Sequence, residues 1–260
     1  NNPLTKTIPG KLLLAYEKSE QWQPAAALLM AQHQAQPDTE LGRESLYVAA
    51  DYYLKAGDKE TSLNTYRSYA HRYPRPLTDA NEARFKLTEF YSEIGDATKR
   101  RFWLNKLIEA DQKAGSERSA RSRYLAAMAS MVFATDADTA YQKIKLTLPL
   151  NKSLQRKQNA LKNAISRYDG VMAYGIAEYT TQANYSLANL YSVLAKDLME
   201  SSRPNGLSAL ELDQYELLLE EQAFPFEETS ITLHENNAKR AHGGLYDDWL
   251  KESLKKLENL

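Results

Sequence analysis

The sequence predicts an all-α protein, and three observations lead to that fold class. The chain has only 10 Gly and 9 Pro among 260 residues, too few for the many tight turns of a β-protein. Apolar residues recur at helical spacing through most of the chain. A set of small and aromatic residues also returns with a period near 37 residues, which indicates an architecture built from one repeated helical unit.

The clearest copy of the repeat lies in residues 46–76. Its landmark residues are Ala50, Tyr53, Gly57, Ser62, Tyr66 and Pro74. The upstream copy has Glu20 in place of the glycine, and its other landmarks are Leu13, Tyr16, Ala25, Leu29 and Pro37. The downstream copy continues with Thr88, Tyr91, Gly95, Leu104 and Leu107. The step from Tyr16 to Tyr53 is 37 residues and the step from Tyr53 to Tyr91 is 38.

Each copy carries the signals of a pair of helices. Gly57 is placed to end the first helix, and Asp58 is an acidic residue suited to begin the second. Pro74 and Pro76 end the second helix, because proline has no amide donor and clashes with the preceding turn. We therefore expect three antiparallel helix pairs in residues 1–117.

These landmarks resemble the tetratricopeptide repeat (TPR), a helix–turn–helix unit of about 34 residues. The resemblance implies an α-solenoid of antiparallel helix pairs, which is a TPR-like superhelix. For the whole chain we expect about twelve helices and no strand.

After residue 118 the repeat fades but the helical period persists. We expect helices over residues 118–134, 137–148, 153–173, 180–200, 208–221, 227–241 and 247–257. Residues 201–207 contain Ser, Pro and Gly and form the strongest break, and Ser208 with Glu211 has the spacing of a capping box. We expect divergent helical repeats to continue the solenoid over 118–200, and C-terminal helices to occupy 201–260 after this linker.

Residues 177–188 and 208–228 resemble the C-terminal part of large periplasmic TPR proteins of Gram-negative bacteria. Such proteins accompany envelope complexes of the TonB/ExbB or Tol class, or gliding-motility machinery. The resemblance implies a periplasmic interaction protein and a fragment of a longer repeat array, with the cytoplasm as the alternative location. The chain begins at Asn1 without an initiator Met or a signal peptide, so we expect a processed or excised piece.

Little in the sequence predicts catalysis or a cofactor. The absence of Cys excludes disulfides, Cys-ligated zinc and thiol catalysis. His234 and His242 could approximate a metal pair, but two exposed histidines on a helix and its terminal turn explain them better. Adjacent carboxylates such as Glu220 and Glu221 favour an exposed helix face over an acid–base pair. We expect no enzyme activity, no cofactor and no metal.

Charge is unevenly distributed although the net charge is only −1. Residues 99–167 carry 15 basic and 5 acidic side chains, whereas residues 197–235 carry 10 acidic side chains and one basic. The two stretches could bind ligands of opposite charge, or they could face each other across the superhelix or between subunits. Binding of nucleic acid through residues 99–167 is a further alternative, although few aromatic residues accompany these cations.

In the TPR family the first helix of each unit lines a concave groove. Carried onto this sequence, the groove positions are Glu44, Tyr47, Asp51 and Lys55 in one unit and Glu82, Phe85 and Glu89 in the next. Tyr47 and Phe85 then form aromatic anchors among carboxylates, suited to a peptide with basic side chains. The alternative is that both rings pack against the neighbouring helix.

The sequence therefore predicts a non-catalytic TPR-like scaffold that binds another protein or peptide, as part of a bacterial cell-envelope complex. Two alternatives stay open: an enzyme on a helical scaffold that acts on an envelope polymer, and a nucleic-acid adaptor. Membrane insertion is not expected, because the longest apolar stretches are far shorter than the roughly 20 residues needed to cross a bilayer.

Overall fold

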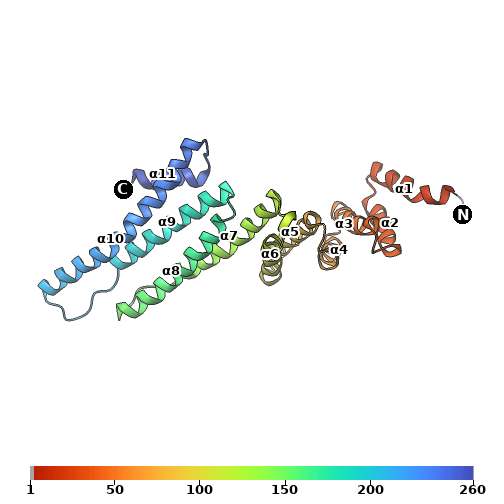
Figure 1. The fold of residues 1–260 in the computed structure, drawn as a ribbon. Helices are drawn as coiled ribbons and strands as arrows, with labels where there is room; N and C mark the ends of the chain where they lie inside the picture. The colour runs from red at the N-terminus through yellow and green to blue at the C-terminus, as the bar shows by residue number, and fades with distance from the viewer. Residues whose placement is uncertain (1–2, 260) are drawn as a thin grey trace. The chain divides into compact units, whose positions relative to one another are not determined.

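The computed structural model describes residues 3–259, and their side chains from Pro9 onward. This part of the chain forms eleven α-helices and two short 3₁₀ segments, with no strand (Figure 1). The all-α prediction is confirmed. None of the helices within these described residues is both long enough and apolar enough to cross a membrane.

Contacts divide the chain into two compact units, Asn1–Leu125 and Ala126–Leu260. The division falls inside one helix, α7, which begins in the first unit and ends in the second. The predicted segments 1–117, 118–200 and 201–260 differ from one another in type of repeat, and they stay predictions.

The first unit contains short helices, each packed against the next along the chain. Their bounds are α1 Pro3–Lys18, α2 Trp22–Ala35, α3 Glu40–Lys55, α4 Lys59–Arg72, α5 Leu77–Glu93 and α6 Ala97–Gln112, followed by the 3₁₀ segment Gly115–Glu117. Three large rings, Tyr66, Tyr69 and Tyr91, are almost completely buried together with leucines and alanines of α3, α4 and α5. Small residues such as Ala50 and Ala83 let the helices approach these rings closely.

The turns after α1, α3 and α5 have the same geometry. Glu20, Gly57 and Gly95 all have positive φ, at 54°, 83° and 73°. At each turn the next amide donates to the tyrosine carbonyl five residues back, at 2.9 Å; the pairs are Gln21 to Tyr16, Asp58 to Tyr53 and Asp96 to Tyr91. This is the hydrogen bond of a Schellman cap, and the alignment of Glu20 with the two glycines is confirmed.

The second unit contains long helices and one short helix, α11, at its end. Their bounds are α7 Ala120–Gln142, α8 Leu150–Met172, α9 Ala177–Met199, α10 Ala209–Lys239 and α11 Asp248–Glu258, with the 3₁₀ segment Arg240–Gly243 before α11. Helix α9 packs against α8, α10 and α11. Ser208 and Glu211 form the predicted capping box at the start of α10.

Two predicted breaks are wrong. The expected helices 118–134 and 137–148 are one helix, α7, that ends at Gln142, because Ala134, Ala137 and Tyr141 are buried along one continuous face. The expected helices 208–221 and 227–241 are also one helix, α10, which continues through Pro225. Proline in a helix interior costs about 3 kcal/mol. Leu219 and Ala223 before Pro225 and Ser230 after it are buried, so packing on both sides of the proline favours a continuous helix.

Candidate functional site

The predicted groove residues lie on two helices of the first unit. Glu44, Tyr47, Asp51 and Lys55 are on α3, and Glu82, Phe85 and Glu89 are on α5. Glu44, Lys55 and Glu89 are exposed, whereas the other four are partly buried.

Tyr47 is shared between the core and the surface. Its ring makes edge contacts with Tyr66 and Tyr69 of α4, at centroid distances of 5.7 Å and 5.2 Å. Burial raises the pKa of Tyr47 well above its ordinary value, and the carboxylates of Asp51, Glu82 and Asp79 raise it further, in that order. Tyr47 therefore packs against the neighbouring helix on its inner side, while three carboxylates surround its hydroxyl.

Asp51 accepts a hydrogen bond from the hydroxyl of Tyr66, which is buried beneath it. Burial is the largest cause of the raised pKa of Tyr66, followed by this hydrogen bond, and Glu89 contributes as well. One carboxylate of α3 and one of α5 thus act on the same buried ring. We call Asp51, Asp79, Glu82 and Glu89, with the rings of Tyr47 and Phe85, the acidic face.

A guanidinium is already bound at this face. Nε and Nη2 of Arg121, at the start of α7 in the same unit, donate to the two carboxylate oxygens of Glu82 at 2.7 Å and 3.0 Å. The guanidinium carbon also lies 5.3 Å from the centre of the Phe85 ring and 5.6 Å from that of Tyr124. The bond to Glu82 is the main reason that the pKa of Arg121 is raised. A bidentate carboxylate beside an aromatic ring is the arrangement that suits arginine best.

Lys55 does not share the surroundings of these residues. Its ammonium lies over the rings of Trp22, at 4.4 Å, and Tyr52, at 5.1 Å. Tyr52 donates to Glu17 at 2.5 Å, so this corner of α3 is occupied by contacts with α1 and α2.

Sequence reasoning missed Asp79 and Arg121. Asp79 lies three residues before Glu82, a spacing that places the two side chains together on a helix. Arg121 follows Glu82 by 39 residues, close to one repeat step, so extending the repeat by one copy could have found it.

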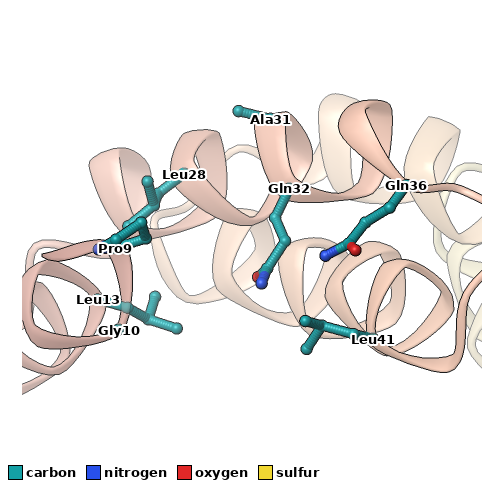
Figure 2. A pocket seen from close by; sticks show the side chains of 8 residues that line it. All are labelled: Pro9, Gly10, Leu13, Leu28, Ala31, Gln32, Gln36 and Leu41. Carbon is teal, nitrogen blue, oxygen red and sulfur yellow. The ribbon is translucent and has the colours of Figure 1, made fainter. Parts of the chain in front are cut away.

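A concave site lies among α1, α2 and α3, with a volume of about 520 Å³. Figure 2 shows its lining side chains, which come from all three helices. They are Pro9, Gly10, Leu13, Leu28, Ala31, Gln32, Gln36 and Leu41. The described part of the lining is apolar apart from the two amides and contains no titratable side chain, so it suits an apolar group rather than acid–base chemistry.

The basic stretch 99–167 contains fewer free cations than its composition suggested. It is divided between the two units, since residues up to 125 belong to the first. Five of its cations are held by carboxylates of the chain; the pairs are Lys99 with Asp96, Lys106 with Glu109, Arg118 with Asp111, Arg121 with Glu82, and Lys157 with Asp197. Lys157 is fully buried, donates to the Ile144 carbonyl at 2.9 Å and lies over the Tyr141 ring.

His234 and His242 lie in different environments. His234 is buried, with Nδ1 3.2 Å from Oγ of Ser253, and burial lowers its pKa to about 4. His242 is exposed in the 3₁₀ segment after α10. Within residues 3–259, no group of three or more His, Asp or Glu side chains is placed to hold a metal ion.

No protein-family model matches this chain, and no curated protein matches it at a significant level.

Proposed function

We propose that this chain is a non-catalytic, TPR-like protein-interaction module that binds a segment of another protein through the acidic face. The segment carries basic side chains, with arginine preferred over lysine. The periplasm and an envelope complex are the setting that the sequence resemblance implies, and they rest on that resemblance alone.

The observation that carries this proposal is the binding of Arg121 to Glu82 and Phe85. Arg121 is partly exposed, so a surface arginine already uses the acidic face as a ligand's arginine would. Asp51, Asp79 and Glu89 add negative charge around the same rings. Clustered carboxylates beside half-buried rings favour cationic ligands through charge and cation–π contact together.

The TPR-like class is supported by the recurrent turn. Three turns with one hydrogen-bond pattern separate the helices of successive pairs, at the spacing of the sequence repeat. In a stack of such pairs the first helices would form one continuous surface, and α3 and α5 would be the first helices of two successive pairs.

Selection of peptides on the intact chain tests the proposal. Random 16-residue peptides displayed on phage are selected on the wild-type protein, and the enriched peptides are measured by fluorescence anisotropy. We expect the enriched sequences to contain an excess of arginine. We expect the variant D79N/E82Q to bind them at least tenfold more weakly, because it removes two charges and the bidentate acceptor.

The matched control is D38N/E60Q, which removes two exposed carboxylates of the same unit that lie on neither α3 nor α5. It is expected to retain near wild-type affinity, and circular dichroism checks that both variants stay folded. Enriched peptides without basic residues, or equal binding by D79N/E82Q, contradict the proposal.

A further inference from the structure

Helix α10 of the second unit carries large apolar side chains on its solvent side. Leu210, Leu217 and Phe224 are 68%, 57% and 57% exposed, and they follow one another at intervals of seven residues. Seven residues are close to two helical turns, so the three side chains form one line about 21 Å long. We call Leu210, Leu217 and Phe224 the apolar seam.

The opposite side of α10 packs against α9. Leu219 and Ala223 are buried there, and the ring of Phe226 stacks on Tyr191 with centroids 6.4 Å apart. The core of the second unit therefore does not use the apolar seam. Isolated exposed leucines are common in proteins, but a continuous apolar line along a helix indicates a contact surface.

Carboxylates flank the apolar seam in two columns. The first column lies three residues after the seam residues and consists of Asp213, Glu220 and Glu227. Four residues after the second and third seam residues lie Glu221 and Glu228. All five are exposed, and within residues 3–259 none of them forms an ion pair. Leu217 and Phe224 thus have negative charge on both sides, and Leu210 has it on one side.

We propose that the apolar seam is the docking site of an amphipathic helix from another protein, one whose apolar heptad positions are flanked by Lys or Arg. The apolar line matches the apolar face of such a helix, and the two carboxylate columns match its basic flanks. A second copy of this chain fits poorly, because pairing α10 with itself would place carboxylates against carboxylates. An anionic bilayer would repel the same carboxylates.

A synthetic helix tests this proposal on the full chain. The probe is a fluorescent peptide of about 21 residues, with Leu at the first and fourth heptad positions and Lys at the fifth and seventh. One companion peptide replaces every Lys by Glu, and the other replaces every Leu by Ser. We expect the first peptide alone to bind in fluorescence anisotropy, with affinity that falls as salt is raised.

Two protein variants locate the binding. We expect each of them, L217S/F224S and E220K/E221K, to lower the affinity for the probe peptide at least tenfold. I94S removes a leucine-sized side chain that is 64% exposed in the first unit, and it is expected to have no effect. D79N/E82Q is also expected to have no effect, which separates this proposal from the proposed function of the acidic face.

The proposal is overturned if the Glu peptide binds as well as the Lys peptide, or if L217S/F224S binds the probe like wild type. It is also overturned if sedimentation shows a dimer of this chain that L217S/F224S dissociates, because a second copy then covers the apolar seam. Because the seam residues are exposed, these variants are expected to keep the wild-type circular dichroism and denaturation midpoint.

Discussion

Most helices of the second unit are longer than those of the first. Helices α2–α6 of the first unit have 14 to 17 residues, whereas α7, α8 and α9 each have 23 and α10 has 31. In the first unit, Gly57 is followed at once by Asp58, whose side chain caps the next helix. In the second unit, Gly170 lies inside α8 and the helix continues to Met172. The comparison teaches that a glycine limits helix length where its backbone takes a positive φ, as at Gly57, and does not where its backbone stays helical, as at Gly170.

The cores of the two units differ as well. Both cores contain buried tyrosine rings and alanines, and the first also buries Arg84 and Asp111. The second buries the ammonium of Lys157 and a polar cluster around His234 and Asn237. Asn237 donates to the Thr181 carbonyl at 2.9 Å and to Ser253 at 3.0 Å. Because His234 is a buried imidazole, we expect the stability of the second unit to depend on pH between about 4 and 6.5.

Removing Asp197, the ion-pair partner of Lys157, is expected to cause the largest loss of stability. D197A leaves a fully buried ammonium without its carboxylate, which destabilises proteins by about 3–5 kcal/mol. Urea denaturation of the full chain measures the loss. In the first unit, D38A breaks the exposed pair with Arg72 and should leave the denaturation midpoint nearly unchanged.

The double variant K157M/D197L completes that comparison. It replaces the ion pair by apolar groups of similar size and should recover most of the stability lost in D197A. Equal stability of D197A and the wild type would contradict the role given to Lys157.

Lowering the pH is expected to have the next largest effect on stability, because His234 becomes protonated on unfolding. Its pKa is lowered from 6.5 to about 4 by burial and, to a smaller extent, by Lys256, so the folded protein keeps the imidazole neutral. Between pH 6.5 and 4 the unfolded chain binds a proton that the folded chain does not. Stability should therefore fall with decreasing pH by up to about 1.4 kcal/mol per pH unit from this residue.

The measurement is the difference in urea midpoint between pH 7 and pH 5, compared between wild type and H234Q. We expect the variant, which cannot be protonated, to lose part of the pH dependence. The control H242Q changes an exposed histidine and should retain it. An unchanged pH dependence in H234Q would show that other groups cause it.

The smallest predicted effect concerns glycine-to-alanine substitutions, which should change stability in opposite directions in the two units. At Gly57, φ is +83°, a conformation that alanine adopts only with strain, so G57A should destabilise by about 1 kcal/mol. At Gly170 an added Cβ meets no atom within 4 Å and the backbone is helical, so G170A should stabilise by about 0.5–1 kcal/mol. Denaturation midpoints that shift in the same direction would contradict the explanation of helix length.

The sequence predicted the first unit better than the second for a physical reason. Local signals such as Gly57, Asp58 and Pro74 define turns without reference to the rest of the molecule. The continuity of α7 and α10 depends instead on packing against other helices, which offsets weak local breaks such as Pro225. Similarly, the helix positions of Tyr47 and Phe85 could be read from the repeat, but the pairing of Glu82 with Arg121 joins residues 39 apart and required the fold.

Replacing Arg121 tests the central claim about the acidic face most directly. R121Q removes the guanidinium that occupies Glu82 and Phe85, while R123Q removes the same charge from a neighbouring exposed position. We predict that R121Q binds the selected arginine-containing peptides at least fivefold more tightly than wild type, and that R123Q changes their affinity little. Unchanged or weaker binding by a folded R121Q protein would contradict the claim that the acidic face recognises basic ligands as it holds Arg121.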